Sequence, residues 1–313
     1  MPQRTILVAD DIETRTESGK RRSQAICAAA SSLAERLRTG IDLLYVEDIK
    51  SSPPPQFDAS RIRAWHSRHE THLAEVGRGY PVPVHLVLKS GSPAEQILKA
   101  LRAKAAPELV VVGTQGRKGL KRLLIGSVAE EVIRHSKRPV LVVGPAAQEQ
   151  GETRIGQKQI KILVATDLSK NSRAAEQYAL SLARRLGAGV VLFHCLWDSY
   201  STMIRGSSVV SGWVPVNLDE MLYQIRDDAI RTLKQKSLYF QNHGVPCDYK
   251  LEDKAVLSSC AVYQEGDRGY ALVVMGTHGR NALLNAFFGS TARETILNGS
   301  TPVITVHSPI EGR

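Results

Sequence analysis

The 313-residue sequence has few aromatic residues, few cysteines and no long apolar run. Aromatic residues make up 5% of the chain and no nucleic-acid-binding motif is recognisable, which argues against a nucleic-acid-binding module despite a net charge of +10. The four cysteines show neither a CxxC pair nor metal-ligand spacing, so we expect free thiols in a reducing compartment. Apolar runs such as 109–112 are far shorter than the roughly 18 residues of a membrane span. Because Asp10 and Asp11 interrupt the first apolar stretch, no signal peptide is expected. These absences predict a soluble protein of the cytoplasm.

Several catalytic and phosphate-binding signatures are also missing from the sequence. There is no GxxxxGK[ST] loop, no GxGxxG and no nucleophile elbow, so we name no catalytic residue. His66, His69 and His72 recur at intervals of three, which leaves two interpretations, a shared metal ion or a solvated helix face. Because no further carboxylate or cysteine completes a site, we favour the solvated face and predict no metal site.

The sequence repeats itself, and this is its most informative feature. The segment ILVADD at 6–11 recurs as ILVATD at 162–167, an offset of 156 residues. LVVVGTQGR at 109–117 recurs as LVVMGTHGR at 272–280, an offset of 163, and RPVLVV at 138–143 recurs as TPVITV at the same offset. We therefore predict two tandem domains, 1–145 and 160–313, joined by a polar linker at 146–159.

Within each copy, short apolar runs alternate with amphipathic stretches. The runs are apolar on both faces, as expected for parallel strands that helices cover on either side. We predict two tandem doubly wound, Rossmann-like α/β domains, each with a five-stranded parallel sheet. The strands are expected at 5–9, 41–46, 83–88, 109–113 and 139–143, and again at 160–165, 189–195, 247–251, 271–276 and 302–306. The helices are expected at 20–38, 60–78, 93–105 and 127–136, and again at 171–186, 218–242, 255–265 and 290–298.

A glycine motif follows the fourth strand of each copy. It reads Gly113-x2-Gly116-x9-Gly126-Ser127 in the first copy and recurs 163 residues later. Ligands of such sheets bind beyond the carboxyl ends of the strands, where glycine lets backbone amides approach an anion. The final Gly-Ser stands ahead of a helix, whose first N–H groups and dipole favour phosphate oxygens. We therefore predict an anion site in each copy.

This pattern, with the opening ILVA-x-D and the closing Pro-Val strand, resembles the universal stress protein family over nearly the whole chain, twice. The resemblance implies ATP binding, with Mg²⁺ as an optional companion, in one or both halves. Carried over motif by motif, it implies a first pocket made by Ala9, Asp11, Val46, Val112, Gly113, Gly116, Gly126, Ser127 and Val128. It implies a second pocket made by Ala165, Asp167, Cys195, Met275, Gly276, Gly279, Gly289, Ser290 and Thr291.

The two copies depart from each other around this motif. The family's histidine between the leading glycines is present as His278 but is Gln115 in the first copy. The first copy also has seven extra residues before its first helix, which could reshape the adenosine end of its pocket. Its basic loop at 117–122 either grips a triphosphate or is a solvated loop. In the second copy, Phe287-Phe288 is either core or an exposed contact for a partner.

The resemblance also implies that the two halves pair through their closing strands as an intramolecular pseudo-dimer, with further association into a homodimer open. We expect a nucleotide-dependent regulatory role in a stress response, with at most slow hydrolysis, because no residue is evident to orient a water. The alternative is a nucleotide hydrolase or a phosphoryl- or adenylyl-transferase that uses the same glycine loops. The sequence names neither the stress signal nor a protein partner.

Overall fold

The computed structural model describes residues 4–12, 16–48, 59–114, 125–151, 153–196, 218–253, 257–277 and 288–308. The first half contains β1 (Thr5–Ala9), α1 (Glu17–Leu37), β2 (Gly40–Asp48), α2 (Ala59–Arg78), β3 (Val84–Gly91), α3 (Pro93–Leu101), β4 (Leu109–Gly113), α4 (Ser127–His135) and β5 (Val140–Val143). The second half contains β6 (Lys161–Ala165), α6 (Arg173–Leu186), β7 (Gly189–Cys195), α8 (Leu218–Asn242), β8 (Cys247–Glu252), α9 (Ser258–Gly266), β9 (Leu272–Gly276), α10 (Ser290–Asn298) and β10 (Val303–Val306). Every predicted helix and strand is present, with ends that differ by a few residues.

Helix α1 illustrates how local sequence sets an element. The Thr16 hydroxyl caps its start by accepting a hydrogen bond from the Gly19 N–H at 3.0 Å. The helix ends where Arg38 adopts a left-handed conformation. Its buried face carries Ala25, Ala29 and Ala30, whose small side chains let the helix lie close to β1 and β4.

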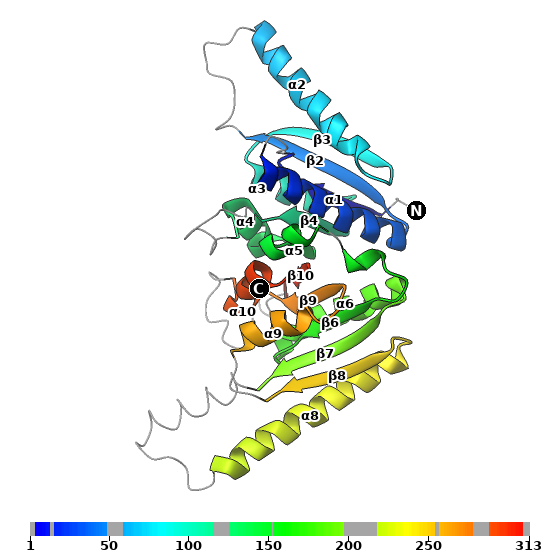
Figure 1. The fold of residues 1–313 in the computed structure, drawn as a ribbon, viewed down its shortest axis with the longest axis vertical. Coiled ribbons are helices and arrows are strands. Elements are labelled where there is room, and N and C mark those ends of the chain that lie inside the picture. Colours follow the sequence, from blue (N-terminus) through cyan, green and yellow to red (C-terminus); the bar gives the residue numbers. More distant parts are fainter. Residues whose placement is uncertain are drawn as a thin grey trace, which may run out of the picture.

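The ten strands form one sheet in the order β3-β2-β1-β4-β5-β10-β9-β6-β7-β8. All neighbours within each half are parallel, as the wholly apolar runs of β4 and β5 predicted. The predicted α/β fold, with five parallel strands in each half, is therefore confirmed, and the two sets of five are joined in one sheet. Figure 1 shows the two halves following one another along the long axis of the molecule.

The halves join through one antiparallel strand pair, which confirms the predicted pairing of the closing strands. Val303 of β10 lies opposite Val142 of β5, Ile304 opposite Leu141, and Thr305 opposite Val140. Leu141 and Ile304 are counterparts in the repeat, since they are 163 positions apart. A residue that faces its own counterpart lies on the axis of a twofold relation. The two halves are therefore related by an approximate twofold axis at this pair.

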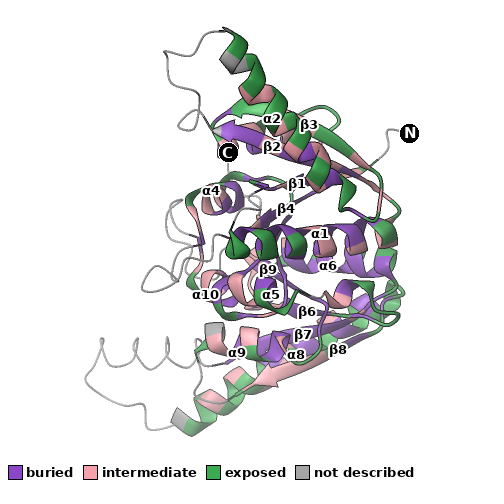
Figure 2. Ribbon diagram, turned by 45° about the horizontal axis from the view of Figure 1, so that its top comes forward, coloured by how far each residue is buried: buried purple, intermediate pink, exposed green. Residues whose placement is uncertain are grey.

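Helices cover both faces of the sheet and divide the core into two clusters. Alternate residues of β1 point to opposite faces, with Ile6 and Val8 in one cluster and Leu7 in the other. The first cluster packs against α1, α2, α6 and α8, and the second against α3, α4, α9 and α10. Figure 2 shows that burial is concentrated in the strands and inner helices, while α2 and α8 expose more of their surface.

The segment predicted as a polar linker is folded in this structure. It forms the short helix α5 (Pro145–Gln150) and the 3-10 turn η3 (Arg154–Gly156), both in contact with α1. Ala147 and Ile155 are buried, and so is Gln148, whose side-chain amide donates to the carbonyl oxygens of Thr114 and Val143 at 2.9 Å each. The domain boundaries themselves stay a prediction.

Among the helices of the described ranges, none is both long enough and apolar enough to cross a lipid bilayer.

Candidate functional site

The apolar residues predicted to line the two pockets lie at the carboxyl edge of the sheet. In the first half, Ala9 ends β1 and lies beside Val112 of β4, and Val46 lies two residues beyond the β2 partner of Ala9. All three side chains belong to the core cluster on the α3 and α4 face. This edge, between β1 and β4, is where the strand order changes direction, and it is where ligands of doubly wound sheets bind.

The second half repeats this arrangement. Ala165 ends β6 beside Met275 of β9, and Cys195 lies two residues beyond the β7 partner of Ala165. These three side chains lie on the face covered by α9 and α10, and they belong to the same core cluster as their counterparts. The six apolar residues that the family resemblance singled out therefore lie at matching places in the two halves, three in each half.

The last glycine of each motif stands at the start of a helix. Gly126 precedes α4 with φ 106°, a conformation that only glycine adopts easily, whereas Gly289 precedes α10 with φ −58°. Ser127 and Ser290 are exposed at the first helical positions, followed by the half-buried Val128 and Thr291. The first N–H groups of a helix have no partner within the helix, so these ends can accept an anion.

The first glycine of the motif has a packing role that the sequence did not indicate. A Cβ at Gly113 would lie 2.6 Å from Cδ1 of Ile26 and 2.9 Å from Cγ of Arg22, both on α1. A side chain at this position would force these two side chains of α1 to move, so the approach of α1 by itself favours glycine here. Gly276 ends β9 at the corresponding place.

Part of the predicted site lies outside the described residues. This part comprises Gly116 and Gly279, Gln115 and His278, the basic loop 117–122 and its counterpart up to Phe287. Phe288 lies in the described part and is 7% exposed. Of the two alternatives for this residue, core or exposed partner contact, the structure therefore shows core.

The aspartate of the first copy is held by a cation that the sequence reasoning missed. Nη2 of Arg22 donates to Oδ1 of Asp11, and Nε of Arg22 lies 3.9 Å from Oδ1 of Asp10. Asp10 is buried and its Oδ2 accepts a 2.5 Å hydrogen bond from the Ser23 hydroxyl. Burial raises the pKa of Asp10, and the Ser23 hydrogen bond opposes that shift. The doubled aspartate in ILVADD was a signal that one carboxylate would point inward and one outward.

The aspartate of the second copy is held by hydroxyl groups from its own loop. Oδ1 of Asp167 accepts hydrogen bonds from the Ser169 N–H at 3.0 Å, from the Ser169 hydroxyl at 2.7 Å and from the Ser172 hydroxyl. These contacts hold the turn η4 (Lys170–Ser172) at the start of α6. The two aspartates thus occupy matching places in the sheet, but they have different partners.

Each aspartate is followed by a residue in an uncommon backbone conformation. Ile12 has φ 47° and Leu168 has φ 63°, in the left-handed region where residues other than glycine are rare. The two residues are counterparts, since both follow the repeated ILVA-x-D segment. Such residues cost about 1–3 kcal/mol and cluster at functional sites. Their recurrence marks this turn as a feature kept in both halves.

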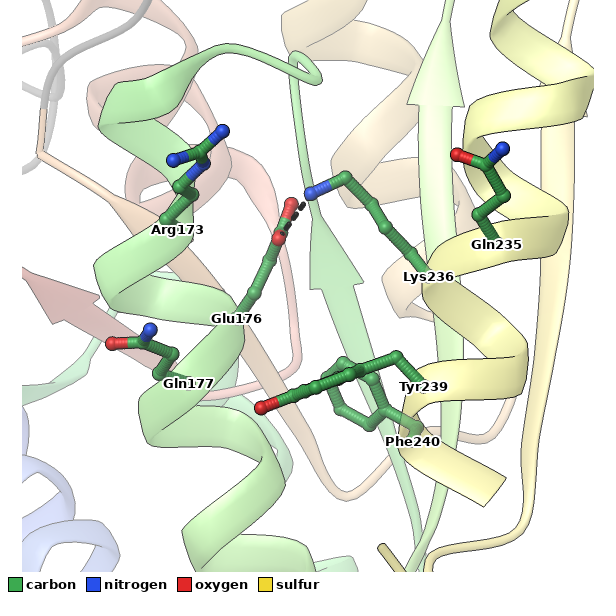
Figure 3. Close-up of a pocket in the computed structure, with 7 residues that line it drawn as sticks. All are labelled: Arg173, Glu176, Gln177, Gln235, Lys236, Tyr239 and Phe240. Atoms are coloured by element: carbon green, nitrogen blue, oxygen red, sulfur yellow. Dashed lines mark hydrogen bonds and ion pairs between the residues drawn. The ribbon is translucent and has the colours of Figure 1, made fainter. Parts of the chain in front are cut away.

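Glu176 on α6 forms an ion pair with Lys236 on α8, close to the end of β6. The Thr166 hydroxyl donates to Oε1 of Glu176 on α6 at 2.7 Å, and Oε2 of Glu176 pairs with Nζ of Lys236 on α8. A hollow of about 270 Å³ lies between the two helices and is also lined by Tyr239 and Phe240. Figure 3 shows the Glu176–Lys236 pair among the residues that line this hollow. The hollow contains none of the residues predicted to bind nucleotide.

Two of the three histidines on α2 contact a buried carboxylate. Nδ1 of His66 and Nδ1 of His69 each lie 2.8 Å from an oxygen of Glu47, which is 4% exposed and also accepts from the Ser90 hydroxyl at 3.0 Å. Neither a shared metal ion nor a solvated helix face, the two interpretations of this series, accounts for ion-pair contacts with a buried glutamate. Within the described ranges, no group of three or more histidine, cysteine or acidic side chains could hold a metal ion.

The chain is similar to known proteins over both halves. A sequence profile of the universal stress protein family matches residues 3–144, 160–239 and 251–307. Universal stress protein MJ0531 of Methanocaldococcus jannaschii is 44% identical over 77 residues, which are 25% of this chain and 45% of that protein. A universal stress protein of Mycolicibacterium smegmatis is 25% identical over 248 residues, 77% of this chain and 76% of that protein.

Solved structures agree with this comparison. The crystal structure of a universal stress protein from Archaeoglobus fulgidus aligns with a TM-score of 0.62 at 17% identity, over 98% of this chain and 97% of that chain. Other matched universal stress proteins were solved in complex with dAMP and with cAMP, and their TM-scores of 0.34 and 0.31 are too low to place a ligand on this chain. Because the profile covers most of both repeats, the chain belongs to the universal stress protein family and carries its domain twice in tandem.

Proposed function

We propose that this protein binds an adenine nucleotide, ATP in the first instance, at the carboxyl edge of each half. The observation that carries the proposal is a repeated coincidence of three features at that edge. Each half has three apolar side chains on one face, an aspartate followed by a left-handed residue, and a Gly-Ser pair opening a helix. Packing alone does not require all three features to recur together.

In this proposal the three kinds of residue have separate roles. Ala9, Val46 and Val112 provide an apolar surface for the adenine ring, and Asp11 faces the adenosine end. The N-terminus of α4, with Ser127 and Val128, receives the phosphates, because its first N–H groups and the helix dipole favour negative charge. Ala165, Cys195, Met275 and Asp167, with Ser290 and Thr291 on α10, take the same roles in the second half.

The proposed role is regulation rather than turnover. Nucleotide occupancy would order the edge of the sheet, and a partner would read that change. Mg²⁺ enters only as a companion of the phosphates, with no protein ligands assigned to it. We further propose that the two domains are 1–145 and 160–313, that the protein acts in the cytoplasm, and that two chains can associate further. Any hydrolysis is slow in this proposal.

Nucleotide bound per chain is the quantity that tests this proposal. The purified protein is denatured with acid and its nucleotide content is measured by chromatography, before and after incubation with ATP. We expect a loss of one bound nucleotide from Ser127→Asp and of another from Ser290→Asp. An acidic side chain in the first turn stabilises a helix but repels phosphate, so these variants should stay folded.

Ser92→Asp is the matched control, because Ser92 caps α3 at the same edge of the sheet but belongs to neither proposed pocket. It should retain the wild-type nucleotide content. A wild-type protein that holds no nucleotide and takes up none from added ATP would contradict the proposal, and so would equal losses in all three variants.

A further inference from the structure

The axis between the two halves brings together one pair of residues of opposite charge. Glu130 on α4 and Arg293 on α10 are 163 positions apart, so they are counterparts in the repeat, just as Leu141 and Ile304 are. Nη2 of Arg293 donates to Oε2 of Glu130 at 2.8 Å. Each member of this pair therefore faces its own counterpart across the approximate twofold axis. Figure 1 shows α4 and α10 on either side of the middle of the molecule, where the halves join.

The environment of this pair increases the effect of its charges. The side chains of Glu130 and Arg293 are 23% and 29% exposed, so both are partly removed from water. Arg134 also binds Glu130, with Nη2 at 3.0 Å from Oε1, and its counterpart Leu297 carries no charge. Coulomb interactions are stronger in such surroundings than at an open surface.

Symmetry determines which residues would meet on the axis if two first halves, or two second halves, paired with each other. If two first halves from different chains paired through β5, a glutamate would face a glutamate on the axis. If two second halves paired through β10, an arginine would face an arginine. Only a first half with a second half places opposite charges there.

A second ion pair across the junction discriminates against only one of the two alternatives, the pairing of two second halves. Both Nη atoms of Arg185 on α6 bind the carboxylate of Glu108, at 2.8 and 2.9 Å. The symmetric contact would join Arg36 to Ala271, since these are the counterparts of Arg185 and Glu108. The alanine side chain cannot accept the hydrogen bonds, so two second halves would lose this contact on both sides of the axis. Two first halves would place Arg36 opposite Glu108 on both sides, so their rejection depends on Glu130 alone.

The apolar part of the junction offers no such discrimination. Leu141 faces Ile304 and Val142 faces Val303, and either strand would present similar apolar side chains to a copy of itself. We propose that the charges at the axis, Glu130 and Arg293 above all, select the partner of each half. The first half fits the second half and rejects a second copy of itself, and the converse holds for the second half.

Charge reversal in the full chain tests this proposal directly. Arg293→Glu creates the Glu–Glu contact that two first halves would make, and Glu130→Arg creates the Arg–Arg contact of two second halves. The double variant Glu130→Arg/Arg293→Glu restores opposite charges with their places exchanged. Glu131→Arg is the matched control, since Glu131 is an exposed acidic residue of the same helix.

We expect each single reversal to lower the Tm of unfolding by about 2–5 °C, measured by calorimetry, and the double variant to recover at least half of the combined loss. The control should shift the Tm by less than either reversal. A double variant that loses as much as the two singles together would overturn the proposal, and so would single reversals that match the control. If a single variant does not fold, recovery of a folded chain in the double variant is the expected result, and failure to recover it overturns the proposal.

Discussion

Gly144 lies at the junction of the two halves, and alanine there should destabilise the protein measurably. Gly144 ends the first half before α5, and its φ of −74° is one that alanine adopts without strain. An ideal Cβ at this position would lie 3.1 Å from the carbonyl carbon of Ile296 on α10 and closer still to the carbonyl oxygen. A backbone atom cannot rotate away as a side chain can, so α10 must shift relative to α5.

The size of the effect follows from two opposing contributions. Overpacking of this kind costs up to about 3 kcal/mol. Replacing glycine by alanine also restricts the unfolded chain, which stabilises the folded state by about 0.4–1 kcal/mol. We therefore expect Gly144→Ala to lower the free energy of unfolding by about 2 kcal/mol.

Urea denaturation of Gly144→Ala and Gly40→Ala would measure this difference. Gly40 is the control because its Cβ would meet only Cγ2 of Thr5, at the ordinary distance of 3.6 Å. The control should equal or exceed the wild type in stability. If the two variants have the same free energy of unfolding, the inferred close approach of α10 to Gly144 is wrong.

Three further predictions concern the candidate site and its supports. Gly126→Ala should cost about 1–2 kcal/mol in thermal unfolding because of its φ of 106°, whereas Gly289→Ala, at φ −58°, should cost clearly less; equal costs would contradict the difference in backbone conformation. Because burial raises the pKa of Asp10 above 3.8, the folded state binds this proton more tightly than the unfolded state does, and stability from this group falls as pH rises from 3.8 toward the folded pKa. Asp10→Asn should flatten that part of the curve of unfolding free energy against pH, and an unchanged curve would refute the assignment. Lys236→Met should cost about 3 kcal/mol by leaving the Glu176 carboxylate buried without its cation, and adding Glu176→Gln should recover part of the loss in the same denaturation assay; no recovery would show that the ion pair is not the cause.

The repeat in the sequence made most of the fold predictable. Strands such as β4 and β5 are apolar at every position, and this pattern occurs only where helices cover both faces of a sheet. Ala9, Val46 and Val112 were implied by the family resemblance, and the structure places them on one face of the sheet, since position within a strand fixes the face. The pairing of the closing strands was implied by the resemblance, whereas its register, with Leu141 opposite Ile304, is known only from the structure.

The folded linker could not be predicted, because its composition is that of a loop. Gln148 is polar, yet it is buried with its amide satisfied by the carbonyl groups of Val143 and Thr114. A sequence pattern shows that a residue is polar but does not show whether a partner will meet it inside the protein.

The residues that bind the carboxylates at and near the candidate site could not be predicted from the sequence either. Arg22 reaches Asp11 across eleven positions, and Lys236 reaches Glu176 across sixty. No local spacing indicates either pair. Gly113 shows a related limit, since a glycine that makes room for a helix and a glycine that admits an anion look alike in a sequence.

The covalent joining of the two halves has a consequence for how such a protein can evolve. In an assembly of two identical chains, every substitution occurs twice, so a residue on the axis always meets the same residue. Here a substitution in one half occurs once, and Glu130 can meet Arg293. The same independence lets the turn around Asp11 acquire an arginine while the turn around Asp167 acquires serines. A tandem chain can thus specialise one half while the other keeps its original chemistry, which a pair of identical subunits cannot do.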